Sequence, residues 1–302
     1  MSVVSQENEK NSRLAKRFYL ENTDPIGEAK DWGQAMGQIR SAAYAALEAS
    51  NYLRDFEAAL TVSGHHMLIF RHLLAPPKSQ DQFSLLCPEW SKASEKSGKA
   101  LREDKALAAS KVLDTWKDRS ITPWLDEQRL PTDTEKALIV ERIVSFIAPK
   151  LTETQKRNRL SYDQENAVIQ LLRGLGWTQS KSFLIDELSA IKPRTFMHKA
   201  RFATATTNAQ EVDIACGLKQ GIVAAMECKV TNDATNSVKR VNDILKKAKA
   251  WKDHWGSFVE TAALLQGVIK PSDVQRLTDD GVRVFWSHDL SEFSGWVEER
   301  TQ

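Results

Sequence analysis

The chain has 302 residues, of which 41% are hydrophobic and 27% charged, and its formal net charge is +2. This composition is typical of a globular protein, and the length allows one large domain or two ordinary ones. A net charge so close to zero excludes a chain that is basic throughout, so any surface for nucleic acid has to be local. No apolar run approaches the ~18 residues of a membrane-spanning helix, and the N-terminus lacks a signal-peptide core, so we expect a cytoplasmic protein.

We predict that residues 1–155 form an all-helical N-terminal domain. Residues 31–60 are rich in alanine, contain no proline and place apolar side chains three and four residues apart, which is typical of a helix. A later helix is expected to begin near Thr132 and Asp133. We expect it to end at Pro149, because proline has no N–H to donate to the preceding turn.

Residues 156–302 change character and are predicted to form an α/β domain. The elements expected in chain order are a helix closed by Gly174 and Gly176, strands at 211–217 and 221–230, a basic helix at 233–256, a strand at 261–269, a helix at 272–281, a strand at 282–286 and a closing helix at 289–300. This order is typical of a mixed central sheet flanked by helices.

Three charged residues stand in two otherwise apolar strands. Asp213 interrupts the first strand, and Glu227 and Lys229 lie near the end of the second. Side chains two residues apart in a strand share a face. Glu227 and Lys229 are therefore expected on one face, and Asp213 on the opposite side of its strand from Val212 and Ile214. A hairpin turn between the strands would place Asp213 roughly across from Glu227.

Two interpretations of this cluster are open, because three buried charges without partners would be costly. In the structural one, Lys229 forms an ion pair with one acid and solvent covers the other. In the functional one, Asp213 and Glu227 hold a divalent cation and Lys229 orients an attacking water. The Glu-x-Lys spacing also occurs at Glu28–Lys30 and Glu103–Lys105, but in helical segments with no acid-bearing strand before them. The strand context therefore favours a metal-dependent nuclease site.

The segment VDIACG…IVAAMECKV resembles the signature of the PD-(D/E)xK nuclease superfamily, with Asp213, Glu227 and Lys229 at the three motif positions. Val212 precedes the aspartate where the name of the motif has a proline. Within 155–298, the stretches ECKVTNDATNSVKRVNDILKKAKAW, AALLQGVI and VFWSHDL also resemble the XamI-type type II restriction endonucleases.

This resemblance implies a PD-(D/E)xK restriction-endonuclease-like core in residues 156–302. It also implies Mg²⁺-dependent cleavage of double-stranded DNA at a short palindromic site, leaving 5′-phosphate ends. Asp213 and Glu227 are then expected to hold the metal ion with the carbonyl of Cys228, while Lys229 positions or activates the water. The N-terminal domain is expected to serve DNA recognition, dimerisation or both, in a homodimer whose symmetry matches that of the DNA site.

Other functions stay open at this point. One is a PD-(D/E)xK nuclease with little sequence specificity, used in phage defence or repair. Another is a DNA-binding module that has lost cleavage, although loss of activity would be expected to remove at least one of Asp213, Glu227 and Lys229. A third is an α/β protein with a buried ion pair and no nuclease activity.

The basic helix after the second strand supplies the candidate contacts to DNA. Lys239 and Arg240 are expected to bind the phosphates that flank the cleaved bond, and Asn232, Asn236 and Ser237 to add neutral hydrogen bonds. A solvated helix face is the alternative for these positions, and it is the favoured interpretation for the lysines from Lys246 to Lys252.

Glu165 lies on the helix before the core strands and is a possible additional acidic ligand of the metal site. A surface glutamate is the alternative, and Asp163 is a weaker candidate for the same role. The basic segment 193–202 is a candidate to line the DNA cleft.

The cysteines and five of the six histidines are not expected to form a second metal or catalytic site. The cysteines are too far apart for a zinc site and are expected to be reduced and buried: Cys87, Cys216 and Cys228. The histidines lack an acid at metal-ligand spacing or read as structural or surface residues: His65, His66, His72, His198 and His288.

Overall fold

The computed structural model describes residues 4–206, 208–219 and 221–302, which divide between two compact units. One unit is Pro25–Lys156, and the other joins Arg157–Gln302 with Met1–Asp24. None of the helices in these described residues is long and apolar enough to cross a membrane.

Helix α1 (Gln6–Glu21) packs with the second unit, although the predicted helical domain began at residue 1. Ala15 of α1 is 1% exposed and belongs to the same apolar cluster as Val274. The side-chain amide of Asn8 donates a hydrogen bond to Gln275 Oε1 at 2.9 Å. These long-range contacts explain why composition alone did not assign this segment to its unit.

The unit Pro25–Lys156 is built from helices. They are α2 (Pro25–Ala49), α3 (Phe56–Val62), α4 (His66–Phe70), α5 (Gln80–Leu86), α6 (Lys92–Ser97), α7 (Glu103–Trp116), the 3-10 turn Arg119–Ile121, α8 (Pro123–Asp126) and the first part of α9 (Asp133–Gly174). Its core contains the rings of Phe56 and Phe70, which meet edge to face with centroids 4.9 Å apart.

Helix α9 continues through Pro149, so the prediction that a helix ends there is wrong. Proline removes one hydrogen bond and crowds the preceding turn, which favours a break when the position is considered alone. However, Ile143, Ile147 and Ala148 just before it are buried in the core of the helical unit. Tertiary packing therefore offsets the local cost of the proline. The predicted end of the helix at Gly174 is confirmed.

The second unit is organised around a seven-stranded mixed sheet with the order β1–β3–β4–β5–β6–β7, in which β2 also pairs with β3. The strands are β1 (Thr178–Gln179), β2 (Leu184–Ile185), β3 (Thr195–Phe202), β4 (Gln210–Gly217), β5 (Val223–Thr231), β6 (Val259–Gly267) and β7 (Arg283–Trp286). Neighbours from β3 to β5 are antiparallel, whereas β5, β6 and β7 are parallel. The predicted mixed sheet is confirmed.

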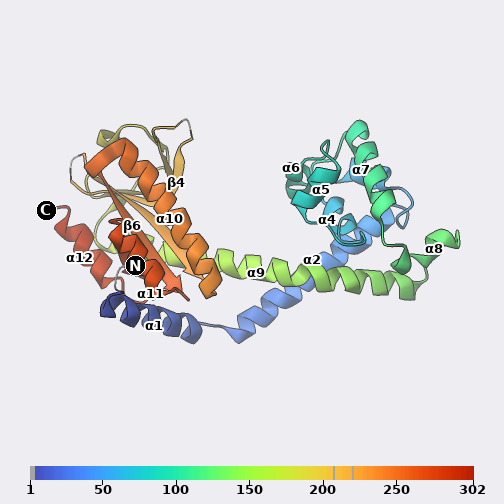
Figure 1. Ribbon diagram of the computed structural model, residues 1–302, viewed down its shortest axis with the longest axis horizontal. Helices are drawn as coiled ribbons and strands as arrows, with labels where there is room; N and C mark the ends of the chain where they lie inside the picture. Colours follow the sequence, from blue (N-terminus) through green and yellow to red (C-terminus); the bar gives the residue numbers. More distant parts are fainter. Residues whose placement is uncertain (1–3, 207, 220) are drawn as a thin grey trace. The chain divides into compact units, whose positions relative to one another are not determined.

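Helices cover both faces of this sheet. The last part of α9 and α12 (Ser291–Glu299) share a cluster with Leu264 of β6, whereas α10 (Ala234–Trp255) and α11 (Pro271–Asp279) share a cluster with Leu265. Adjacent residues of a strand point to opposite faces, so the two pairs of helices lie on opposite sides. Figure 1 shows α10 and α11 in orange beside the strands and α12 in red.

Candidate active site

Asp213 and Glu227 are neighbours on the antiparallel strands β4 and β5. The paired register reaches Ile214 opposite Met226, and the two acids are the next residue on each strand. Asp213 is 5% exposed and Glu227 is fully buried. The backbone N–H of Cys228 donates to Asp213 Oδ2 at 2.8 Å. The structure therefore brings the two acids together, as the strand spacing predicts.

Lys229 places its ammonium group between these acids. Its Nζ lies 3.0 Å from Asp213 Oδ2, 2.7 Å from Glu227 Oε2 and 3.2 Å from the carbonyl oxygen of Cys228. The three oxygens that were predicted to hold a metal ion thus converge on one positively charged atom. Carboxylate and carbonyl oxygens are the ligands that hard divalent cations prefer, so the donor set fits such an ion.

Charge in the cluster is stabilised by its neighbours. Burial raises the pKa of Asp213, but Lys229 and Lys199 outweigh burial and lower that pKa to about 2. Burial lowers the pKa of Lys229, but Glu227 and Asp213 outweigh it and raise that pKa above the ordinary value. For Glu227 burial is the largest effect and raises its pKa, although Lys229 and Lys247 act in the opposite direction. Asp213 and Lys229 are therefore an ionised pair near neutral pH.

A second lysine joins Asp213 to Glu165. Lys199 Nζ lies 2.5 Å from Asp213 Oδ1 and 2.8 Å from Glu165 Oε1, and His198 Nε2 lies 2.7 Å from the other oxygen of Glu165. Glu165, on α9, is 6% exposed, so it is part of the cluster rather than a surface residue. Asp163 is exposed. Lys199 and His198 belong to the basic segment 193–202 that was expected near the DNA.

The backbone is strained where β3 faces Asp213. Lys199 has φ +57°, in the left-handed region that side chains with a Cβ rarely adopt. On the facing strand, Val212 packs in one apolar cluster and Ile214 in another. The expectation that both point away from Asp213 to the same side is therefore wrong, because strict alternation breaks at this residue. Strained residues of this kind cluster at functional sites.

Lys247 of α10 also binds the cluster. Its Nζ lies 2.9 Å from each carboxylate oxygen of Glu227 and 2.7 Å from the carbonyl oxygen of Glu211. The prediction of a solvated face is therefore wrong for Lys247. A signal was present in the sequence, because Lys247 is three residues after Ile244 and four before Trp251, both of which are buried.

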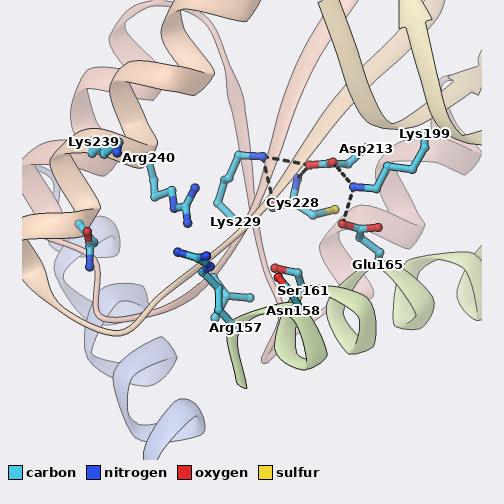
Figure 2. Close-up of a pocket in the computed structure, with 12 residues that line it drawn as sticks. Arg157, Asn158, Ser161, Glu165, Lys199, Asp213, Cys228, Lys229, Lys239 and Arg240 are labelled. Carbon is cyan, nitrogen blue, oxygen red and sulfur yellow. Dashed lines mark hydrogen bonds and ion pairs between the residues drawn. The ribbon is translucent and has the colours of Figure 1, made fainter. Parts of the chain in front are cut away.

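An open pocket of about 400 Å³ lies over Asp213 (Figure 2). Its lining combines two acids, five cations and five other residues: Glu165 and Asp213; Arg157, Lys199, Lys229, Lys239 and Arg240; and Asn158, Ser161, Cys228, Val230 and Asn236. The surplus of positive charge above a cluster of acids suits an anionic substrate whose reacting group meets a cation site.

The predicted DNA contacts divide into three groups in the structure. Asn236, Lys239 and Arg240 line the pocket. Asn232 is exposed, lies outside the pocket lining, and accepts a hydrogen bond from Asn236 at 3.2 Å. Ser237 is fully buried, and its hydroxyl donates to Asp273 at 2.8 Å. Because Ser237 is buried, it joins α10 to α11 and has no exposed surface that DNA could contact.

The cysteines and the histidines of the helical unit add no second metal site among the described residues. All three cysteines are free and buried, as predicted. The ring nitrogens of His65, His66 and His72 each lie within 2.9 Å of a backbone carbonyl oxygen in the helical unit. Among the described residues, no group of three or more His, Cys, Asp and Glu side chains is arranged to hold a metal ion. A metal site here therefore rests on two carboxylates, a carbonyl and further ligands from solvent or substrate.

Comparisons with known proteins match most of the chain to one family. A model of the XamI restriction endonuclease family matches residues 51–286. The type II restriction enzyme XamI of Xanthomonas campestris pv. amaranthicola is 28% identical over 191 residues, which cover 62% of this chain and 66% of that enzyme, just under two thirds of its length. Among solved structures, protein VC1899 of Vibrio cholerae has a TM-score of 0.28 and 10% identity, over 91% of this chain and 57% of that one. A TM-score this low does not define a shared fold.

Proposed function

Because the chain belongs to the XamI restriction endonuclease family, we propose that it is a type II restriction endonuclease that hydrolyses phosphodiester bonds of double-stranded DNA at specific sites. The observation that carries this proposal is the convergence of oxygens from Asp213, Glu227 and Cys228 on the ammonium group of Lys229. Burying two carboxylates and a lysine under a basic pocket costs considerable free energy. Nuclease chemistry of the XamI type is a function that would explain this arrangement.

Mg²⁺ is the cofactor that we propose for this site. Asp213, Glu227 and the carbonyl of Cys228 would hold it, because all three offer hard oxygen donors. When bound, Mg²⁺ would supply electrostatic stabilisation of the charge that develops on the phosphate during hydrolysis. Glu165 is the additional acid in this proposal, since it shares Lys199 with Asp213.

Lys229 is the residue that we assign to the attacking water. An ammonium group donates hydrogen bonds, so Lys229 orients the water and stabilises negative charge near the phosphate. Its position is held by Asp213 and Glu227 on either side. Because the three proposed ligand oxygens converge on Lys229 Nζ, the ammonium group would move aside when an ion is held between them. The products in this proposal carry 5′-phosphate ends.

DNA binding and assembly complete the proposal. Lys239, Arg240 and Asn236 would bind backbone phosphates at the pocket, with Asn232 beside them. The helical unit would contribute recognition of bases, dimerisation or both. A two-fold homodimer is the simplest way to cut both strands of a palindrome. Light scattering that finds one subunit per DNA duplex would contradict the dimer.

Digestion of several plasmids by the purified protein tests the function. We expect discrete fragments with Mg²⁺ and none with EDTA. A smear would point to a nuclease of low specificity, for defence or repair. Binding to DNA with no cleavage would point to a non-cleaving module. If the protein neither binds nor cleaves DNA, the nuclease proposal is overturned.

A further inference from the structure

The wall of the pocket formed by α9 carries polar residues that sequence patterns did not single out. Arg157, Asn158 and Ser161 line the pocket together with Glu165. Their spacing of one, three and four residues places them along one face of the helix. This face begins about two turns before Glu165, so it extends from the acid cluster toward the mouth of the pocket.

The cations of the pocket fall into two classes. Lys199 and Lys229 each bind two carboxylates of the cluster below. Arg157, Lys239 and Arg240 also line the pocket, but the side chains of these three residues have no hydrogen bond or ion pair with any residue in the described parts of the chain. Positive charge at the base of the pocket is therefore balanced within the protein, whereas that at its mouth is not.

Two of the unbalanced cations face each other across the pocket. Figure 2 shows the guanidinium groups of Arg157 on α9 and Arg240 on α10 turned toward one another. Like charges that face each other repel, and no carboxylate of the pocket pairs with either guanidinium group. An anion placed between the two helices would remove this repulsion and give each guanidinium an acceptor.

We propose that two groups of residues form a clamp for the DNA backbone. Arg157, Asn158 and Ser161 bind it from α9, and Lys239 and Arg240 bind it from α10. The inference rests on the proposed nuclease function and names how one strand is held over Asp213. The backbone is the part of DNA that fits, because guanidinium groups bind phosphates through paired hydrogen bonds, and Asn and Ser add neutral donors.

Recognition of bases is a poorer explanation for these residues. Among the described residues that line the pocket, none has an aromatic side chain on which a base would stack, and Val230 alone is aliphatic. At about 400 Å³ the pocket lies near the lower end of the range for a single small ligand. It therefore admits a segment of one strand, and the clamp contributes affinity that does not depend on sequence.

The salt dependence of DNA binding in EDTA tests this clamp without relying on cleavage. Each lost phosphate contact lowers the slope of log K against log salt by about one and weakens binding roughly 5- to 10-fold at 0.1 M salt. We expect this for Arg157→Ala and for Arg240→Ala, on specific and non-specific duplexes alike. Arg157→Lys keeps the charge and should keep the slope.

Arg159→Ala is the matched control, since Arg159 is an exposed arginine of the same helix outside the pocket lining. Its slope should equal that of the wild type. If Arg157→Ala also matches the wild type while the wild type cleaves DNA, the clamp is wrong and the nuclease stands. If the slope depends on Arg157 but the wild type never cleaves, the clamp stands and the nuclease proposal falls. A wild type that binds no DNA overturns both.

Discussion

Lys247 Nζ lies 2.9 Å from both carboxylate oxygens of Glu227, which is fully buried on the neighbouring strand β5. Glu227 also binds Lys229 at 2.7 Å, so two ammonium groups share one carboxylate. A buried carboxylate is stable only when such partners replace water. Lys247 therefore keeps Glu227 compensated while Lys229 also binds Asp213 and, in the proposed mechanism, orients a water.

Lys247→Ala should lower both stability and cleavage. Glu227 would keep only Lys229, and we expect a loss of roughly 1–3 kcal/mol in the free energy of unfolding. The midpoint of urea unfolding measures this loss. Lys249→Ala is the control, because the Lys249 side chain is 76% exposed and pairs with Asp253 on the surface. Equal midpoints for the two variants would contradict the role of Lys247.

Lys199→Gly should be more stable than Lys199→Ala. Both variants lose the ammonium group that bridges Asp213 and Glu165, but only glycine adopts φ +57° freely. The left-handed region costs alanine roughly 1–2 kcal/mol, and glycine loses somewhat more entropy on folding, so we expect a net difference of about 0.5–1 kcal/mol. Thermal unfolding of the pair measures it. A more stable alanine variant would mean that the backbone at this position is not strained.

Glu165→Gln should reduce the rate of cleavage by about 10-fold or more, because the amide can no longer neutralise Lys199 beside Asp213. Asp163→Asn, on the same helix but exposed, should stay within about two-fold of the wild type in the same single-turnover assay. If both substitutions had the same small effect, Glu165 would have no part in the active site.

The sequence predicted those parts of the site that depend on neighbours in the chain. Asp213, Glu227 and Lys229 lie on two consecutive antiparallel strands, so the period of a strand was enough to bring them together. Lys199 and Lys247 come from a third strand and from a helix, and their contacts depend on how separate elements pack. The expected alternation of side chains also failed at Asp213. Lys199, which lies opposite, has a left-handed backbone conformation.

The same distinction holds for the fold. The mixed sheet follows from the order of strands and helices. The family resemblance seen in residues 155–298 is confirmed by a family match over residues 51–286. The path of α9 through Pro149 was not predictable, because buried neighbours such as Ile147 offset a local preference for ending the helix.

Single-turnover cleavage of a susceptible duplex by Asp213→Asn, beside DNA binding in EDTA, tests whether Asp213 is part of the active site. Asparagine keeps the shape of Asp213 but removes the charge that Lys199 and Lys229 share. We expect the cleavage rate to fall by at least ~10²-fold with Mg²⁺, while binding in EDTA stays within a few-fold of the wild type. Cleavage at the wild-type rate would contradict the assignment of Asp213, and with it an active site formed by Asp213, Glu227 and Lys229.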